Sequence, residues 1–222
     1  YSLSIENGLE ILRIKTGKID GANLVSRFFN ELFLSHTILF KGRNFFKKRK
    51  CDLIIWYSPS IFFSYLIKKL KFKYKCSTYL ILRDIFPQWA LDTGILQKGL
   101  LFNLLHYFEK QQYKYADVIG VQSPKNILYF IDKKLADIYK IEVLYNWIRL
   151  GNRNFLKTSY RDFFDLYGKI VFFYGGNIGV AQELDNVINL AKRLASYDQV
   201  RFLLVGEGSE VERLKKLILD LK

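Results

Sequence analysis

Residues 171–182 constrain the fold more than any other stretch of this chain. An apolar run rich in β-branched and aromatic residues stops at Gly175 and Gly176, and a helical pattern of apolar residues begins at once. A second apolar run, residues 200–205, also ends at glycine and leads into a second helical pattern. This order predicts a βαβα unit, whose strands must be parallel because a helix crosses over between them.

The glycines after both runs fall where α/β sheets bind ligands, beyond the carboxyl ends of the strands. Backbone N–H groups at a glycine turn and a helix N-terminus suit a phosphate, because they offer unpaired donors and a positive dipole end. The alternative is that these glycines only allow the backbone to turn. The candidate residues are Gly175, Gly176, Gly206, Glu207 and Gly208.

The first part of the chain shows the same alternation of strands and helices. Strands are expected at 9–14, 52–57, 76–82, 116–121 and 141–145, and helices at 22–40, 61–70 and 100–115. The run 52–57 is apolar throughout, which predicts a strand buried on both faces. Further cues are two N-terminal helix signals, Ser123 before Pro124 and a capping box made by Ser209 and Glu212.

Charged residues follow the strand 76–82 directly, at Arg83 and Asp84. Arg83 suits a bidentate contact with phosphate, and Asp84 suits a hydroxyl that must be oriented or deprotonated. The alternative is a local salt bridge between the two. Glu109 is expected to pair with a neighbouring lysine. His36 and His106 share no motif, so both are expected to be packed rather than catalytic.

Lysine and arginine number 35 against 21 acidic residues, and the net charge of +14 predicts attraction to a polyanion. Nucleic acid, an anionic membrane and phosphorylated substrates all qualify. Basic residues alternate with aromatic ones over 41–50 and 68–75, which favours either an anionic lipid contact or a solvated helix end. The longest apolar stretch, 53–67, is too short to span a bilayer.

The two cysteines, Cys51 and Cys76, have neither metal-ligand nor redox spacing. Nothing in the sequence indicates a disulfide, and a reduced, cytosolic compartment fits best. Periodicity is lost over 149–168, which predicts a linker there. The sequence therefore predicts an α/β protein with two Rossmann-like parallel-sheet domains, residues 1–148 and the start of a second domain at 169–222, joined by a hinge.

The order of these motifs resembles the retaining GT-B glycosyltransferases of family four, in the branch that builds bacterial surface polysaccharides such as capsule, lipopolysaccharide O-antigen and colanic acid. The matching positions are residues 52–59, residues 82–87, Glu109 with Tyr113, Ala116 with Asp117, Ser123 with Pro124, Asn146 with Trp147, residues 175–179, Ala181 with Gln182, and residues 204–208.

The resemblance implies transfer of a sugar, with retained anomeric configuration, from a nucleotide-diphosphate sugar such as a UDP-sugar. It implies no cofactor and no essential metal. The amino-terminal domain would hold the acceptor, a polyprenyl-diphosphate-linked sugar or a saccharide, and the carboxyl-terminal domain the donor. The enzyme would be cytoplasmic and peripheral to the inner face of the plasma membrane, and nucleic acid would not be a partner.

The resemblance also assigns site residues. Gly175, Gly176, Asn177, Gly179 and Gln182, with Gly206, Glu207 and Gly208, would surround the donor diphosphate, while Arg83 and Asp84 would be catalytic. Three positions depart from the family pattern. Asn177 stands where many relatives have arginine, Gln182 where many have lysine, and Arg83 where many have a histidine that faces the reacting sugar. The first two departures reduce the positive charge around a diphosphate.

Both domains are expected to be incomplete. The chain starts at Tyr1 and has no methionine, so the family's opening strand and glycine-rich loop would precede it, and the glutamate pair that grips the donor would follow Lys222. The isolated chain is therefore expected to lack activity. Two alternatives stay open at this stage. They are a basic, non-catalytic nucleic-acid-binding protein and a nucleotide-sugar epimerase or isomerase on the same fold.

Overall fold

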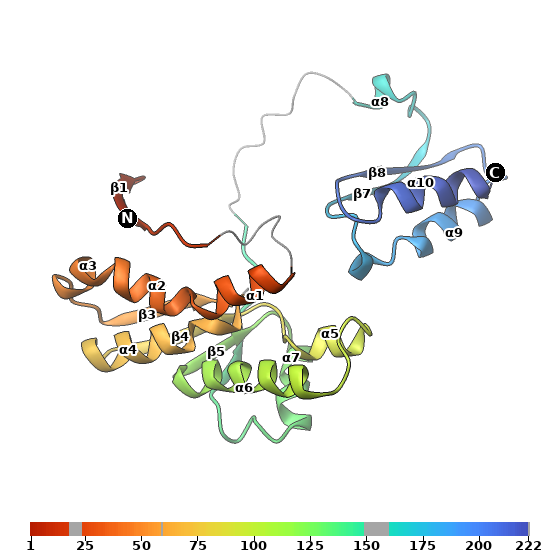
Figure 1. Cartoon of the computed structure of the whole chain (residues 1–222). Helices are drawn as coiled ribbons and strands as arrows, with labels where there is room; N and C mark the ends of the chain where they lie inside the picture. Colours follow the sequence, from red (N-terminus) through yellow and green to blue (C-terminus); the bar gives the residue numbers. More distant parts are fainter. Residues whose placement is uncertain (18–23, 59, 149–159, 222) are drawn as a thin grey trace. The chain divides into compact units, whose positions relative to one another are not determined.

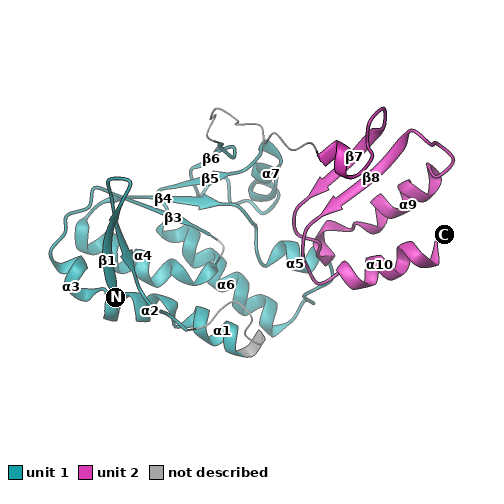
Figure 2. Ribbon diagram, turned by 90° about the horizontal axis from the view of Figure 1, so that it is seen from above, with its two compact units in different colours: residues 1–148 teal, residues 149–222 magenta. Residues whose placement is uncertain are grey.

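The computed structural model describes residues 1–17, 24–58, 60–148 and 160–221. The chain divides into two compact units, Tyr1–Ile148 and Arg149–Lys222 (Figures 1 and 2). Residues 149–159 of the expected linker lie outside the described residues, and its later part contains the short helix α8 (Tyr160–Phe163). No helix in the described ranges is both long and apolar enough to cross a membrane.

The first unit is built on a parallel sheet of four strands. They are β3 (Leu53–Tyr57), β4 (Ser77–Leu82), β5 (Val118–Val121) and β6 (Ile141–Val143), and they lie in the sheet in the order of the sequence. Leu80 is in register with Ile119, and Ile119 with Ile141, so all four strands end at the same edge. The prediction of an α/β fold with parallel strands is confirmed.

Helices connect these strands and supply the core of the unit. They are η1 (Ile61–Phe63), α4 (Ser64–Tyr74), α5 (Gln88–Asp92), α6 (Leu100–Tyr115) and α7 (Pro124–Asp132). Helices α4 and α6 lie along the sheet and contact each other (Figure 2). Leu80, Ile119, Tyr113 and Phe130 are completely buried between sheet and helices, because each stands on the inward face of its element.

The strand β3 is less buried than its composition predicts. Trp56 faces the core, whereas Leu53, Ile55 and Tyr57 are 50%, 57% and 51% exposed. β3 stands at the edge of the sheet, and among the described residues only the face that carries Trp56 is covered. The prediction of burial on both faces is therefore wrong for the described residues.

A hairpin and three short helices precede the sheet. The hairpin strands are β1 (Ser2–Glu6) and β2 (Leu9–Arg13), which sequence patterns predicted only in part. Asn7 and Gly8 between them have positive φ angles of 51° and 79°, as a tight hairpin turn requires. The expected helix over 22–40 is divided at Phe33 into α1 (Leu24–Leu32) and α2 (Leu34–Lys41), and α3 (Arg43–Lys47) follows.

The second unit contains residues 171–182. Its elements after α8 are β7 (Ile170–Gly175), η2 (Val180–Gln182), α9 (Asp185–Arg193), β8 (Val200–Val205) and α10 (Val211–Asp220). The two strands are parallel, as predicted. Helix α9 does not begin at once after the glycines, since a loop and one 3-10 turn intervene. Glu210 rather than Ser209 precedes α10, and the expected capping box does not form.

Glu109 lies in the core of the first unit, with only 1% of its surface exposed. Its carboxylate accepts hydrogen bonds from Tyr113 Oη at 2.7 Å and Tyr129 Oη at 3.3 Å, and it contacts His106 Nδ1 at 2.5 Å. The expected pairing with a lysine is therefore wrong, while His106 is packed as predicted. Burial raises the pKa of Glu109, although the hydrogen bonds from Tyr113 and His106 oppose that rise.

Replacement of Glu109 by alanine should destabilise the chain by about 2–4 kcal/mol, because two tyrosine hydroxyls and the imidazole lose their buried partner. Glu109→Gln keeps an acceptor and should cost less. Urea unfolding measures both, with the exposed neighbour Lys110→Ala as the matched control. A loss for Glu109→Ala no larger than for Lys110→Ala would contradict this account.

The same carboxyl makes stability depend on pH. Because its pKa is raised in the folded chain, folding favours the protonated form. The stability of the wild type relative to Glu109→Gln should be greatest below the ordinary glutamate pKa of about 4.3. It should fall as the pH rises through the interval up to the raised value. Urea midpoints for both proteins across this range measure the difference.

Candidate functional site

Two loops in the second unit carry most of the candidate residues. The first follows β7 at Gly175, and the second follows β8 at Val205, and these two residues are in register. Both loops therefore leave the sheet at its carboxyl edge, which is where ligands bind in open α/β sheets. Gly175, Gly176 and Asn177 in the first loop are exposed, as are Gly206, Glu207 and Gly208 in the second.

Backbone hydrogen bonds join the two loops. Gly176 N donates to Val205 O at 3.0 Å, and Ile178 N donates to Glu207 O at 2.7 Å. Glu210 N in turn donates to Ile178 O at 3.0 Å. The expectation that the paired glycines present free amide hydrogens is therefore wrong for Gly176, because its N–H group is already used inside the protein.

The second loop needs glycine because main chain lies directly against main chain. A Cβ atom on Gly206 would lie 1.8 Å from Gly176 O, and one on Gly208 would lie 2.1 Å from Ile178 O. No real Cβ makes contacts this short, and a carbonyl oxygen cannot rotate aside as a side chain can. The close approach of two loops thus explains Gly206 and Gly208 without any ligand.

Gln182 and Asn177 shape the first loop. Gln182 Oε1 accepts from Gly179 N at 3.1 Å and from Asn177 Nδ2 at 3.0 Å. Tyr174 Oη also donates to Asn177 O at 2.6 Å. The two side chains that the resemblance placed beside a diphosphate therefore contact each other, and Gln182 also binds the loop backbone at Gly179.

Some donors in the loops remain available. Among the described residues, the main-chain N–H groups of Asn177, Glu207 and Gly208 donate to no other group. The three residues are exposed, and they lie in two loops that backbone hydrogen bonds join to each other. Neighbouring free amides of this kind suit an anion such as phosphate.

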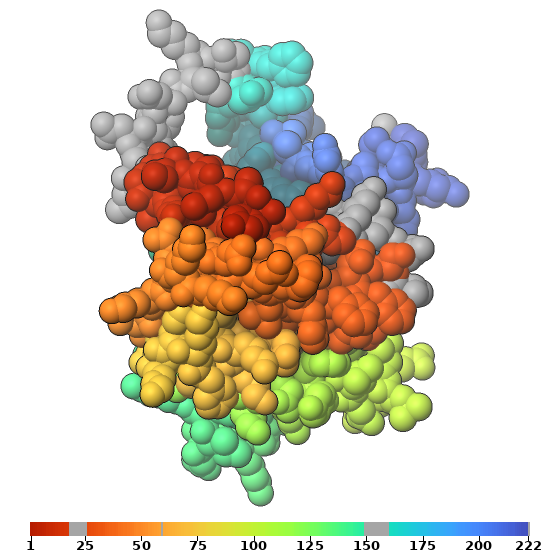
Figure 3. All heavy atoms as spheres, turned by 60° about the vertical axis from the view of Figure 1, so that its left-hand side comes forward, coloured from red at the N-terminus to blue at the C-terminus, as the bar shows by residue number. Residues whose placement is uncertain are grey.

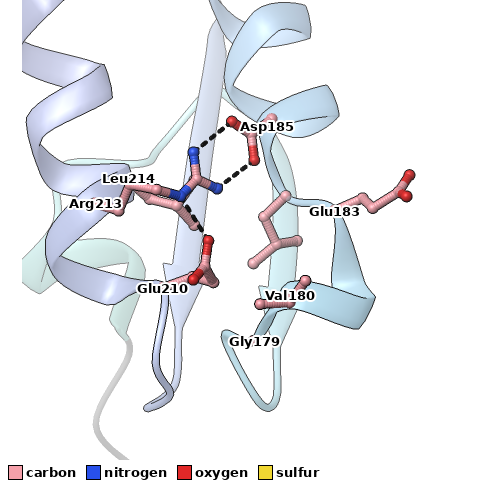
Figure 4. A pocket seen from close by; sticks show the side chains of 8 residues that line it. Gly179, Val180, Glu183, Asp185, Glu210, Arg213 and Leu214 are labelled. Atoms are coloured by element: carbon pink, nitrogen blue, oxygen red, sulfur yellow. Dashed lines mark hydrogen bonds and ion pairs between the residues drawn. The ribbon is translucent and has the colours of Figure 1, made fainter. Parts of the chain in front are cut away.

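A pocket of about 220 Å³ opens beside these loops, between the starts of α9 and α10 (Figure 4). Arg213 crosses it, donating to both oxygens of Asp185 at 2.8 Å and 2.6 Å and to Glu210 at 2.5 Å. The hydrogen bonds from Arg213 lower the pKa of Asp185, and Figure 4 shows Glu183 pointing away from this group.

The pocket does not suit a diphosphate. Its lining carries the carboxylates of Glu183, Asp185 and Glu210, and its guanidinium, Arg213, is already neutralised by two of them. We therefore infer that the ion pair of Arg213 with Asp185 holds α10 against the start of α9. Sequence reasoning missed this group, since Asp185 and Arg213 are 28 positions apart and no local pattern joins them.

In the first unit, Arg83 leaves β4 at the carboxyl edge and is half-buried. Its guanidinium lies 5.0 Å from the centroid of the Trp147 ring and donates to Leu144 O at 3.4 Å. Gln122, which follows the next strand, donates from Nε2 to Arg83 O at 2.6 Å. Side chains from the ends of three neighbouring strands therefore meet around Arg83, and Trp147 keeps 68% of its surface exposed.

Asp84 is exposed and forms no ion pair with Arg83 or any other described residue. The alternative of a local salt bridge is thus wrong, and the carboxylate is open to solvent.

Ser123 precedes α7, but its hydroxyl donates to Asn126 Oδ1 at 2.8 Å and makes no cap to the backbone. Within the described ranges, no group of three His, Cys, Asp or Glu side chains could hold a metal ion.

Comparison with known proteins finds similarity to longer chains, of about twice this length. The chain is 22% identical over 201 residues to "Probable glycosyltransferase WbjE" of Pseudomonas aeruginosa, an alignment that covers 89% of this chain and 49% of the relative. A crystal structure of Anabaena Alr3699/HepE in complex with UDP matches with a TM-score of 0.55 and 18% identity. That match covers 85% of this chain and 48% of HepE.

The likeness establishes a shared fold. It agrees with the parallel sheets seen in both units and with a Rossmann-like architecture. The chain spans about half the length of WbjE and of HepE. No protein-family model matches it.

The substitution Gly206→Ala should destabilise the second unit by about 1–3 kcal/mol, because its methyl group would force two backbones apart. Gly99→Ala is the matched control, since a Cβ there meets nothing within 4 Å. Hydrogen exchange followed by mass spectrometry should show faster exchange in residues 175–182 and 205–210 for Gly206→Ala alone. Equal exchange in the two variants would contradict the close packing of the loops.

Proposed function

We propose that this chain belongs to a retaining GT-B glycosyltransferase of family four, which transfers a sugar from a nucleotide-diphosphate sugar in the biosynthesis of a bacterial surface polysaccharide. One observation carries the proposal. Two braced glycine loops present free amides at the carboxyl edge of a parallel strand pair, in a fold shared with UDP-bound HepE. The similarity to a probable glycosyltransferase supports the same reaction class.

The donor is a UDP-sugar, and no cofactor or metal takes part. The amides of Asn177, Glu207 and Gly208 bind the diphosphate, and Gln182 holds their loop in place. Fixed amide dipoles stabilise the charge that develops on the departing diphosphate without reorganising during the reaction. Glu207 opposes anion binding, so we expect modest affinity for the diphosphate.

Arg83 and Asp84 act at the edge of the first unit. The acceptor hydroxyl oxygen attacks the anomeric carbon from the same face from which the diphosphate oxygen departs, which retains the anomeric configuration, and Asp84 accepts the hydroxyl proton. Arg83 supplies positive charge for a phosphate group, held by Trp147 and Leu144 O. The acceptor is a polyprenyl-diphosphate-linked sugar or a saccharide. The diphosphate of the lipid-linked acceptor would be the group that Arg83 binds.

Titration calorimetry with UDP tests the donor site. UDP should bind the chain, and Gln182→Ala should weaken binding about tenfold, because the loop loses the bonds to Gly179 N and Asn177. Lys215→Ala is the control on the same unit, since Lys215 pairs with the exposed Glu212 and lies outside the two loops. No binding of UDP, or equal binding by both variants, would reject these loops as the donor site. Binding of oligonucleotides in preference to UDP would favour the nucleic-acid alternative.

A basic and aromatic surface covers α2, α3 and α4 of the first unit, which lie side by side in the space-filling view (Figure 3). Phe40 and Phe72 are 68% and 67% exposed there. Arg43 lies 4.8 Å from the ring centroid of Phe40, so charge and apolar surface alternate closely. Exposed cations on this surface are Lys41, Arg43, Lys47, Lys48, Arg49, Lys50, Lys68, Lys69, Lys73 and Lys75.

This surface fits the inner face of a cytoplasmic membrane, where lysines meet anionic headgroups and rings enter the interface. The feature that favours a lipid partner is that Phe40 and Phe72 are exposed beside these cations. The proposed location of the enzyme is therefore cytoplasmic and peripheral to the plasma membrane.

Vesicle flotation tests the membrane surface. The chain should bind vesicles that contain phosphatidylglycerol, bind vesicles of pure phosphatidylcholine weakly or not at all, and dissociate as salt is raised. The double variant Phe40→Ser and Phe72→Ser should reduce binding about tenfold. Phe163→Ser, which changes a 78% exposed ring in the second unit, is the matched control and should have no effect. Equal loss in both variants would reject this surface.

A further inference from the structure

The two cysteines are brought together by strand pairing. Cys51 stands just before β3 and Cys76 just before β4, and these two strands are parallel neighbours. Leu53 is in register with Ser77, and Ser77 N donates to Asp52 O at 3.2 Å. The residues that follow each cysteine are therefore bonded to one another, which fixes the two cysteines at the same edge of the sheet.

Their separation suits a disulfide. Neighbouring strands lie about 4.8 Å apart and rise about 3.3 Å per residue, so positions offset by one across the pair are about 6 Å apart. Cys51 and Cys76 have this offset in the register. Disulfides join Cα atoms that are about 4.4–6.8 Å apart, so the spacing of the two backbones lies within the range for a disulfide.

The thiols interact in their reduced state. Both cysteines are free, Cys76 is buried, and Cys51 is half-buried. Burial raises the pKa of Cys76, and the neighbouring Cys51 raises it further, while Lys71 opposes the rise. Cys51 Sγ donates to Leu53 O at 3.1 Å, which holds the more accessible sulfur beside the strand ends. Tyr74 is a further titratable group close to both sulfurs.

We propose that Cys51 and Cys76 form a reversible dithiol–disulfide site that reacts with small-molecule disulfides such as oxidised glutathione. The Cys51 thiolate attacks one sulfur of the small disulfide, forming a mixed disulfide and releasing one thiol. The Cys76 thiolate then attacks Cys51 Sγ, forming the internal bond and releasing the second thiol. Two protein thiols are oxidised as one external disulfide is reduced to two thiols, so atoms and electrons balance.

The internal bond would lock the amino ends of β3 and β4. This is the end of the sheet opposite to Arg83, and it lies next to the basic and aromatic surface. Tyr74 Oη, two residues before Cys76, donates to Phe46 O on α3 at 2.7 Å. A Cys51–Cys76 disulfide would therefore link the segment after α3 covalently to the segment that follows α4. In a reducing compartment the pair stays a dithiol, so the bond would report oxidising conditions.

The experiment treats the reduced 222-residue chain with oxidised glutathione and maps its peptides under non-reducing conditions. We expect one Cys51–Cys76 cross-link, a loss of two hydrogens from the intact mass, and a fall in titratable thiols from two to none. Dithiothreitol should restore both thiols. Cross-linking should be faster at higher pH, because more of the Cys76 thiol, whose pKa is raised, is then ionised.

Two variants and one denatured control make the result decisive. Cys76→Ser should retain glutathione on Cys51, while Cys51→Ser should react slowly because Cys76 is buried. The internal bond should form at least about tenfold more slowly in urea, where strand pairing no longer holds the sulfurs together. Equal rates in buffer and in urea would overturn the proposal. So would stable glutathione adducts or dimers linked through Cys51 in place of the internal bond.

Discussion

Parallel strand pairing is the constraint on which every candidate site depends. In the first unit, Leu82 is in register with Val121, and Val121 with Val143, so the residues that follow these strands emerge at one edge. Arg83 and Gln122 meet there. The opposite edge collects residues of a different kind, because Asp117 binds the backbone N–H of Thr78 at 2.8 Å and the two cysteines lie before β3 and β4. The register of the parallel strands thus places the cluster around Arg83 at one edge of the sheet and the bonded residues Asp117 and Thr78 at the other.

Packing and ligand binding compete for the same backbone groups in the second unit. Gly206 and Gly208 allow two loops to approach within the space that a Cβ would need, and the approach consumes the N–H groups of Gly176 and Ile178. What remains for an anion is the outer set of amides, at Asn177, Glu207 and Gly208. The two alternatives for these glycines, a backbone turn and a phosphate site, are therefore compatible. The turn that Gly206 and Gly208 permit also positions the free amides of Asn177, Glu207 and Gly208.

Positive charge is distributed unevenly between the basic surface of the first unit and the glycine loops of the second. The excess of lysine and arginine produces an exposed surface on α2, α3 and α4, while Arg213, which lines a pocket with Gly179, is neutralised by Asp185 and Glu210. A diphosphate at the loops would rely on amide dipoles rather than on lysine or arginine side chains of the described second unit. Asn177 and Gln182, which replace basic residues of the family pattern, fit this arrangement because they bond to each other.

The sequence by itself determined the kinds of element and their order, because apolar periodicity reports which side of a segment is buried. The helix expected at 100–115 and the strand expected at 200–205 have these bounds in the structure. Only the tertiary structure decided the partners. Glu109 bonds to Tyr129 across 20 positions, and Cys51 lies beside Cys76, because packing joins segments whose spacing leaves no local pattern. The sequence could not predict the exposure of β3 or the hydrogen bond of the Gly176 N–H group for the same reason. The first depends on which elements cover the strand, and the second on which backbone lies beside the loop.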